Sequence, residues 1–102
     1  MKLTGKQKQF LKSKAHKLSP LFQIGKNGIS EETVNQIEKA LEKRELLKVS
    51  LLQNTESSVE EVETAIESIP GATVVKTIGR VIIVFKPSNQ EKYQRISKEL
   101  PK

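Results

Sequence analysis

The chain has 102 residues, no cysteine and a formal net charge of +6 at pH 7. This length suffices for one hydrophobic core, so we expect a single domain over residues 1–102. The lack of cysteine argues against a disulfide framework or a thiolate metal site and favours a reducing compartment. The sequence has no apolar run long enough for a signal peptide or a membrane span, so we expect a soluble, cytoplasmic protein without a membrane partner.

The charges are unevenly distributed along the chain. Residues 1–28 hold seven lysines and no acid, residues 29–71 hold four basic residues against ten glutamates, and residues 72–102 hold seven basic residues against two glutamates. Such a chain can fold into a particle whose basic side attracts a polyanion, and nucleic acid is the partner we expect. The alternative is that the lysines are ordinary solvated surface.

The first half of the chain predicts two helices and two strands. Thr4 with Gln7 forms a capping-box pattern that begins a helix, whose buried stripe includes Leu11 and Leu18 and which ends at Ser19-Pro20. Next come a short strand over 21–24, a glycine loop over 25–28, a helix that begins after the N-cap Ser30 and ends near Arg44, and a strand over 46–52.

The second half predicts a helix, a hairpin and a last helix. A capping box at Ser57 or Ser58 begins the third helix, which Pro70-Gly71 stops. Strands over 72–78 and 80–86 meet at Gly79, and the second is apolar enough to be central. Ser88 with Glu91 predicts a capping box for a short C-terminal helix. The order α-β-α-β-α-β-β-α indicates an α/β (α+β) domain with a mixed four-stranded sheet and the second and third helices on one face.

The loop Gly25-Lys26-Asn27-Gly28 is the strongest candidate for a binding site. Both glycines can take positive φ angles and bring bare backbone close to a ligand, while Lys26 adds a cation. The helix that follows directs its N–H groups and positive dipole end toward the same place, which favours an anionic group such as phosphate. Any turn between two glycines gives the same pattern, and Glu31 and Glu32 would weaken the site if they faced the same way.

The chain offers few residues for catalysis. It has no aspartate and one histidine, His16, and no carboxylate occurs in the first 28 residues to orient that imidazole, so we interpret His16 as a surface residue. The nucleotide-binding patterns G-x-x-x-x-G-K-[ST] and G-x-G-x-x-G do not occur. We therefore predict a protein that is not an enzyme and has no cofactor, metal or small-molecule substrate. We interpret the glutamates of the middle segment, Glu42 and Glu45 among them, as solubilising groups that repel RNA.

Three segments carry a family resemblance: Leu3–Lys8, Ile24–Ser30 and Ile78–Pro87. Together they resemble the stand-alone bacterial members of the CRM family (chloroplast RNA splicing and ribosome maturation, YhbY-like) over nearly the whole chain. The resemblance implies a KH-like G-x-x-G loop, a fold similar to the C-terminal domain of bacterial translation initiation factor three, and a non-catalytic role on precursors of the large ribosomal subunit. Phe85-Lys86 replaces the tyrosine and arginine more usual in the family, which removes a hydroxyl and a planar guanidinium.

We accordingly predict a monomeric RNA-binding protein that associates with ribosomal RNA in a large-subunit precursor. Three of the four aromatic residues fit the core, so we expect recognition of shape through the sugar-phosphate backbone rather than base stacking. The alternatives are a protein-interaction module that binds a basic ribosomal protein or translation factor through the acidic middle segment, and DNA binding. The expected RNA-contacting residues are Gly25, Lys26, Asn27, Gly28, Lys6, Lys12, Lys17, Lys76, Arg80 and Lys86.

Overall fold

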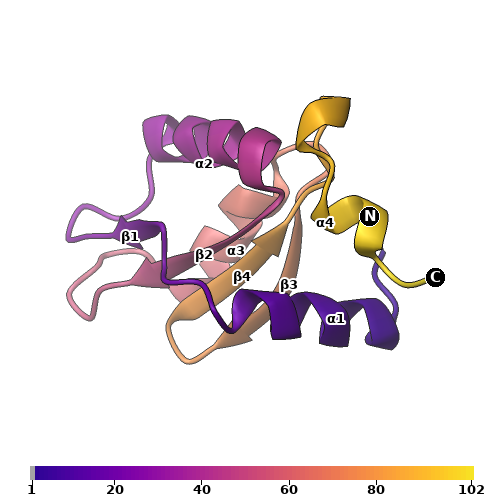
Figure 1. Ribbon diagram of the computed structural model, residues 1–102. Helices are drawn as coiled ribbons and strands as arrows, with labels where there is room; N and C mark the ends of the chain where they lie inside the picture. Colours follow the sequence, from indigo (N-terminus) through magenta and orange to yellow (C-terminus); the bar gives the residue numbers. More distant parts are fainter. Residues whose placement is uncertain (1) are drawn as a thin grey trace.

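The computed structural model describes residues 2–102 and has the predicted order of elements (Figure 1). The predicted C-terminal helix is divided into a 3-10 turn and one short α-helix. The elements are α1 (Gly5–Ala15), β1 (Phe22–Ile24), α2 (Glu31–Arg44), β2 (Leu46–Leu51), α3 (Val59–Glu67), β3 (Thr73–Ile78), β4 (Val81–Phe85), η1 (Glu91–Tyr93) and α4 (Ile96–Glu99).

The four strands form one mixed sheet in the order β1-β2-β4-β3. β1 runs parallel to β2, whereas β2 with β4 and β3 with β4 are antiparallel. β4 therefore lies between two partners, which confirms its prediction as a central strand. The register of β3 on β4 shifts between Val74 and Lys76, so that Lys76 pairs with Ile83.

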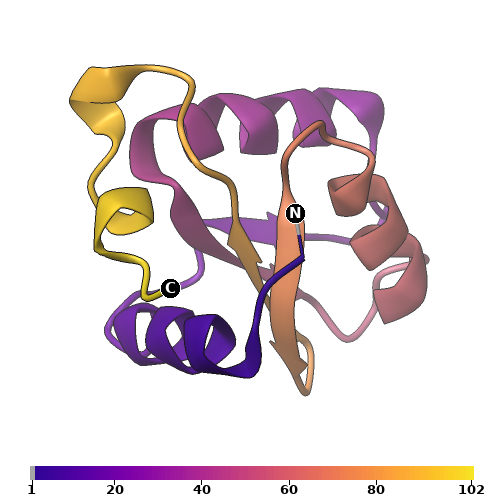
Figure 2. The same ribbon diagram turned by 90° about the vertical axis from the view of Figure 1, so that its right-hand side faces the viewer.

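Helices cover both faces of the sheet (Figure 2). As right-handed crossovers predict, α2 and α3 pack together on one face, where Leu41 and Ile66 lie in the same buried cluster as strand residues such as Val84. On the other face α1 and the C-terminal segment form a second cluster around Leu11 and Phe85. This second face holds the surface that the sequence marks as basic.

Two predictions about helix ends are wrong, and two are confirmed. α1 ends at Ala15, and Leu18 is 39% exposed instead of lying in the buried stripe, because the chain turns there to reach the edge strand β1. The capping box of Ser88 with Glu91 does not form, since the Ser88 hydroxyl donates to the Glu42 carbonyl and η1 has no side-chain cap. The capping boxes of Thr4 with Gln7 and of Ser58 with Glu61 are present as expected.

Candidate nucleic-acid interface

The two glycines of the loop have different conformations and surroundings. The Gly28 N–H donates to the Gly25 carbonyl at 3.0 Å and closes a turn between β1 and α2. Gly28 has a φ of 76°, in the left-handed region that favours glycine, whereas Gly25 does not have a positive φ, so only Gly28 uses the positive φ that both glycines could take. A Cβ on Gly28 would lie 2.3 Å from the Ser57 hydroxyl oxygen, while a Cβ on Gly25 would meet no atom within 4 Å. Gly28 permits close packing, and Gly25 leaves its backbone open to a ligand.

The loop is attached to the connection between β2 and α3. The Ser57 hydroxyl accepts the Ile29 N–H at 3.0 Å, and the Glu56 N–H donates to the Lys26 carbonyl at 3.2 Å. At the start of α2 the Ser30 hydroxyl accepts the Thr33 N–H at 3.2 Å. Two of these bonds use the N–H groups of Ile29 and Thr33, which lie at the helix start where the sequence suggested an anion site. The groups left for a ligand are the exposed side chains of Lys26 and Asn27 and the open backbone at Gly25.

Arg80 joins the tip of the final hairpin to the end of the sheet where the glycine loop begins. Its Nε and Nη2 donate to the Leu51 and Leu52 carbonyls at 3.2 and 2.8 Å. The Leu52 N–H in turn donates to the carbonyl of Ile24, the residue just before Gly25. The exposed guanidinium of Arg80 is therefore held close to the start of the loop.

A hollow of about 300 Å³ lies between α1 and the hairpin, and it is lined by Lys12, His16, Lys48, Ile78, Val81 and Ile83. Its apolar side includes Ile78, which is 56% exposed. Lys48 is a residue that the sequence reasoning missed, because a lone lysine inside an apolar strand gives no signal of its own. Lys48 and Lys76 both pair with Ile83, from opposite sides, so all three side chains lie on one face of the sheet. The hollow thus brings Lys12 of α1 and Lys48 of β2 together beside the apolar residues of the hairpin.

The remaining predicted residues lie further from the loop. Lys17 is exposed just after α1, and Lys6 is exposed in the first turn of that helix, about three helical turns from Lys17. Lys86 is not on this surface, because it is 4% exposed and its ammonium lies 2.5 Å from Oε1 of Glu42. The expected contact of Lys86 with RNA therefore needs correction: this lysine is buried and already paired.

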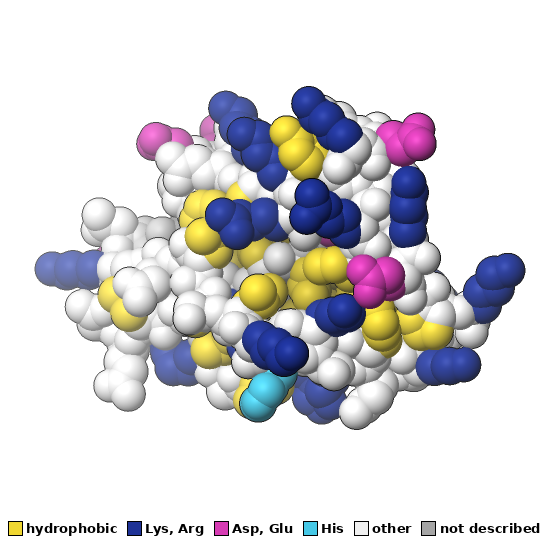
Figure 3. Space-filling model, in the orientation of Figure 1, with side chains coloured by type: hydrophobic (Ala, Val, Ile, Leu, Met, Phe, Trp, Pro, Cys, Tyr) yellow, Lys and Arg dark blue, Asp and Glu magenta, His cyan; other side chains and the backbone are white. Residues whose placement is uncertain are grey.

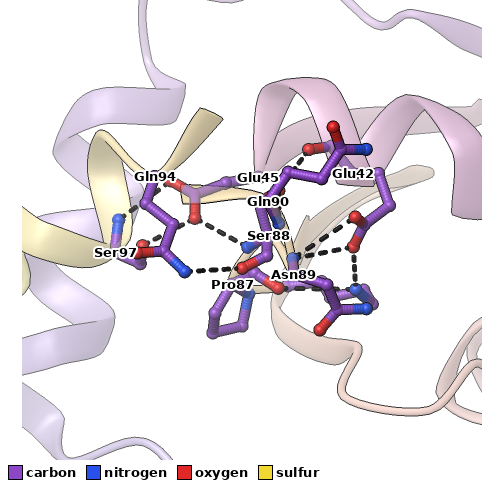
Figure 4. Close-up of polar contacts among 9 residues, drawn as sticks. Glu42, Glu45, Pro87, Ser88, Asn89, Gln90, Gln94 and Ser97 are labelled. Atoms are coloured by element: carbon purple, nitrogen blue, oxygen red, sulfur yellow. Dashed lines mark hydrogen bonds and ion pairs between the residues drawn. The ribbon is translucent and has the colours of Figure 1, made fainter. Parts of the chain in front are cut away.

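Glu42 and Glu45 are structural groups rather than the solubilising residues that the sequence suggested (Figure 4). The hydrogen bond from Lys86 lowers the pKa of Glu42. Glu45 is fully buried in a left-handed conformation with a φ of 64°. Burial alone would raise the pKa of Glu45, but the hydrogen bonds that it accepts outweigh this effect and lower it. The donors to Glu45 are the N–H groups of Ser88, Arg95 and Ser97 and the hydroxyl of Ser97.

The exposed acids of α3 lie behind the sheet as seen from α1, and the face drawn in Figure 3 is mostly basic with hydrophobic patches between the cations. Glu31, at the start of α2, lines a hollow together with Ala65 of α3 and Ser68, the residue that follows this helix. This hollow places Glu31 close to α3.

Within residues 2–102, no three histidine, cysteine, aspartate or glutamate side chains come together in a way that would hold a metal ion. Over the same residues, every helix falls short of the length and apolarity that crossing a bilayer requires.

Comparison with known proteins places this arrangement in a family. Residues 3–86 match the CRS1/YhbY (CRM) domain. The chain is 49% identical to the "Probable RNA-binding protein YqeI" of Bacillus subtilis, covering 88% of this chain and 94% of that protein. It is 38% identical to an "RNA-binding protein" of Haemophilus influenzae, with 90% and 93% covered. The solution structure of SAV1595 from Staphylococcus aureus has a TM-score of 0.74 at 40% identity, covering 98% and 100% of the two chains. The chain therefore belongs to the CRS1/YhbY (CRM) domain family.

Proposed function

We propose that this protein binds structured RNA without catalysing a reaction, and that its target is ribosomal RNA in a precursor of the large subunit in the cytoplasm. The observation that carries the proposal is the meeting of the open backbone at Gly25 with Lys26, Arg80 and the cations around the hollow beside α1. Two relatives named as RNA-binding proteins support RNA as the polyanion. The resemblance to stand-alone bacterial CRM proteins supports the ribosomal setting.

The geometry favours contact with the sugar-phosphate backbone. At Gly25 no Cβ prevents a phosphate from approaching the main chain, and the exposed side chains of the next two residues, Lys26 and Asn27, offer hydrogen-bond donors. Arg80 has a planar guanidinium whose position is fixed by two carbonyl acceptors, so little side-chain entropy remains to be lost on binding. Such contacts read the shape of a folded RNA more than its sequence.

The test is a titration of a labelled, structured fragment of large-subunit ribosomal RNA with the protein, in which fluorescence anisotropy measures binding at several salt concentrations. Four phosphate contacts, from Lys12, Lys26, Lys48 and Arg80, would give a slope of log K against log salt of about −3. Lys26→Gln should reduce the steepness of that slope by about 0.8. Lys98→Gln removes the same charge from α4, outside the surface, and serves as the matched control.

A slope near zero, or no RNA retention by the wild type, would contradict the proposal and favour the acidic segment as a docking surface for a basic protein. Equal effects of Lys26→Gln and Lys98→Gln would leave general charge attraction as the whole explanation and remove the role given to the loop. Competition with duplex DNA completes the experiment, because equal competition by DNA and RNA would contradict recognition of an RNA shape.

A further inference from the structure

A second hollow, of about 380 Å³, lies between the end of α2 and the C-terminal segment. Lys43, Arg44 and Arg95 lie at this hollow together with the half-buried Tyr93, and among residues 2–102 no carboxylate lines it. Leu18, Leu46 and Ile96 supply its apolar lining. On the face drawn in Figure 3, hydrophobic patches lie mainly among basic side chains, with an acidic side chain also beside the central patch. The sequence reasoning had assigned no function to any of these residues.

The backbone that carries Tyr93 and Arg95 is held in place by the buried carboxylate of Glu45. This carboxylate accepts the Arg95 N–H at 2.9 Å and the Ser97 hydroxyl at 2.6 Å, and the Tyr93 N–H donates to the Gln90 carbonyl at 2.9 Å. Burying a carboxylate is costly unless hydrogen bonds compensate it, and the bonds that compensate Glu45 hold the backbone of the short segment that carries Tyr93 and Arg95. The backbone at this side of the hollow is therefore fixed before a ligand binds.

The hollow is continuous with the surface proposed to bind RNA. Nζ of Lys48, which lines the hollow beside α1, donates to the Leu18 carbonyl at 3.0 Å, and Leu18 lines the second hollow. An RNA strand that leaves the hollow beside α1 past Lys48 would reach the second hollow without meeting an acidic side chain among the residues that line the two hollows.

We infer that the second hollow binds one unpaired nucleotide of the bound RNA, with its base against the Tyr93 ring and its phosphates at Arg44 and Arg95. The inference rests on the proposed function. An aromatic ring and arginine guanidinium planes are the groups on which unpaired bases stack, and they read flexible loops, bulges and ends rather than paired helices. The aliphatic residues around them exclude water from the base, and the cations complement its phosphates.

The experiment compares two labelled RNAs: a blunt hairpin, and the same hairpin with a short single-stranded extension. For the extended probe, Tyr93→Leu should weaken binding about tenfold, which is the order of effect of losing one base stacked on an aromatic ring. Arg95→Gln should weaken binding of the same probe more than Lys98→Gln, which removes the same charge on the neighbouring helix outside the hollow. Tyr93→Phe should retain wild-type affinity because it keeps the ring, and none of these variants should change binding of the blunt hairpin beyond the effect of Lys98→Gln.

Two outcomes with the RNA probes would overturn the inference while leaving RNA binding itself intact. One is wild-type affinity of Tyr93→Leu and Arg95→Gln for the extended probe. The other is an equal loss with both probes, which would indicate a general effect on fold or charge. A third outcome concerns a Glu-rich apolar peptide that binds the wild type. If Arg95→Gln abolishes this binding and the peptide does not compete with RNA, the hollow would be assigned to an acidic protein instead. If the wild type binds neither probe, the proposed function fails and the inference fails with it.

Discussion

Replacing Gly28 by alanine should destabilise the fold, whereas the same change at Gly25 should not. At position 28 the alanine would have to adopt a φ of 76°, which costs a non-glycine residue about 1–2 kcal/mol. Its Cβ would also lie 2.3 Å from the Ser57 hydroxyl oxygen, so Ser57 must move and lose its hydrogen bond with the Ile29 N–H. A hydrogen bond of this kind contributes about 0.5–1.5 kcal/mol, so we expect a total loss of roughly 2–3 kcal/mol.

Thermal and urea unfolding, monitored by circular dichroism, measure this loss in the free energy of unfolding. For a domain of this size the expected fall in Tm for Gly28→Ala is roughly 10–20 °C. Gly25→Ala should leave the midpoint unchanged or slightly raised, because its Cβ meets open space and restricts the unfolded chain. In binding, Gly25→Ala should still weaken the complex with RNA, since the methyl group occupies the space through which a phosphate would approach.

A double-mutant cycle with Ser57→Ala separates the clash from the backbone strain. Without the hydroxyl, the nearest side-chain atom to a Cβ on Gly28 is the Ser57 Cβ at 3.4 Å, an ordinary contact. Gly28→Ala should therefore cost about 1 kcal/mol less in the Ser57→Ala background than in the wild type. Additive effects, or equal destabilisation by Gly25→Ala and Gly28→Ala, would refute the assignment of different roles to the two glycines.

Two further predictions concern the carboxylates that hold the C-terminal segment. Lys86→Gln should lower the free energy of unfolding by about 2 kcal/mol, because it leaves Glu42 without its cation. It should change RNA affinity no more than Lys98→Gln does. A larger loss of RNA binding than in Lys98→Gln would contradict the buried position of Lys86. The pKa values of Glu42 and Glu45 are lowered in the folded state, so their contribution to stability is complete above the unfolded-state pKa of about 4.3 and is lost as the pH falls through their folded values. Urea unfolding at a series of pH values gives the free energy of unfolding as a function of pH. In Glu45→Gln, which is less stable at neutral pH, this free energy should fall less on acidification than in the wild type. An unchanged dependence on pH would contradict the role of Glu45.

Local patterns predicted most of the fold because they depend on near neighbours in the chain. The pairs Thr4 with Gln7 and Ser58 with Glu61 cap their helices as expected, since each needs only residues three apart. The pair Ser88 with Glu91 has the same spacing and fails, because the Ser88 hydroxyl finds a partner 46 residues away in the Glu42 carbonyl. No local pattern contains that partner.

The candidate site shows the same division. The glycine loop and the lysines of the first helix could be proposed from sequence because they combine a motif with a run of like charge. Lys48 could not, because its role depends on strand pairing that places it opposite Ile83 and near α1. Lys86 was misassigned for the converse reason, since its position next to a basic hairpin looked exposed until its pairing with Glu42 was known.

The sequence by itself determined the order of the elements, the position of the glycine loop and the separation of basic from acidic segments, because periodicity, turn residues and charge are read along the chain. Only the tertiary structure decided which charged residues are exposed and which are buried and paired. It showed Gly25 open and Gly28 packed against Ser57, and it showed Glu45 buried beneath a segment that carries Tyr93. These outcomes depend on contacts between residues 28 or more positions apart, and no local pattern specifies them.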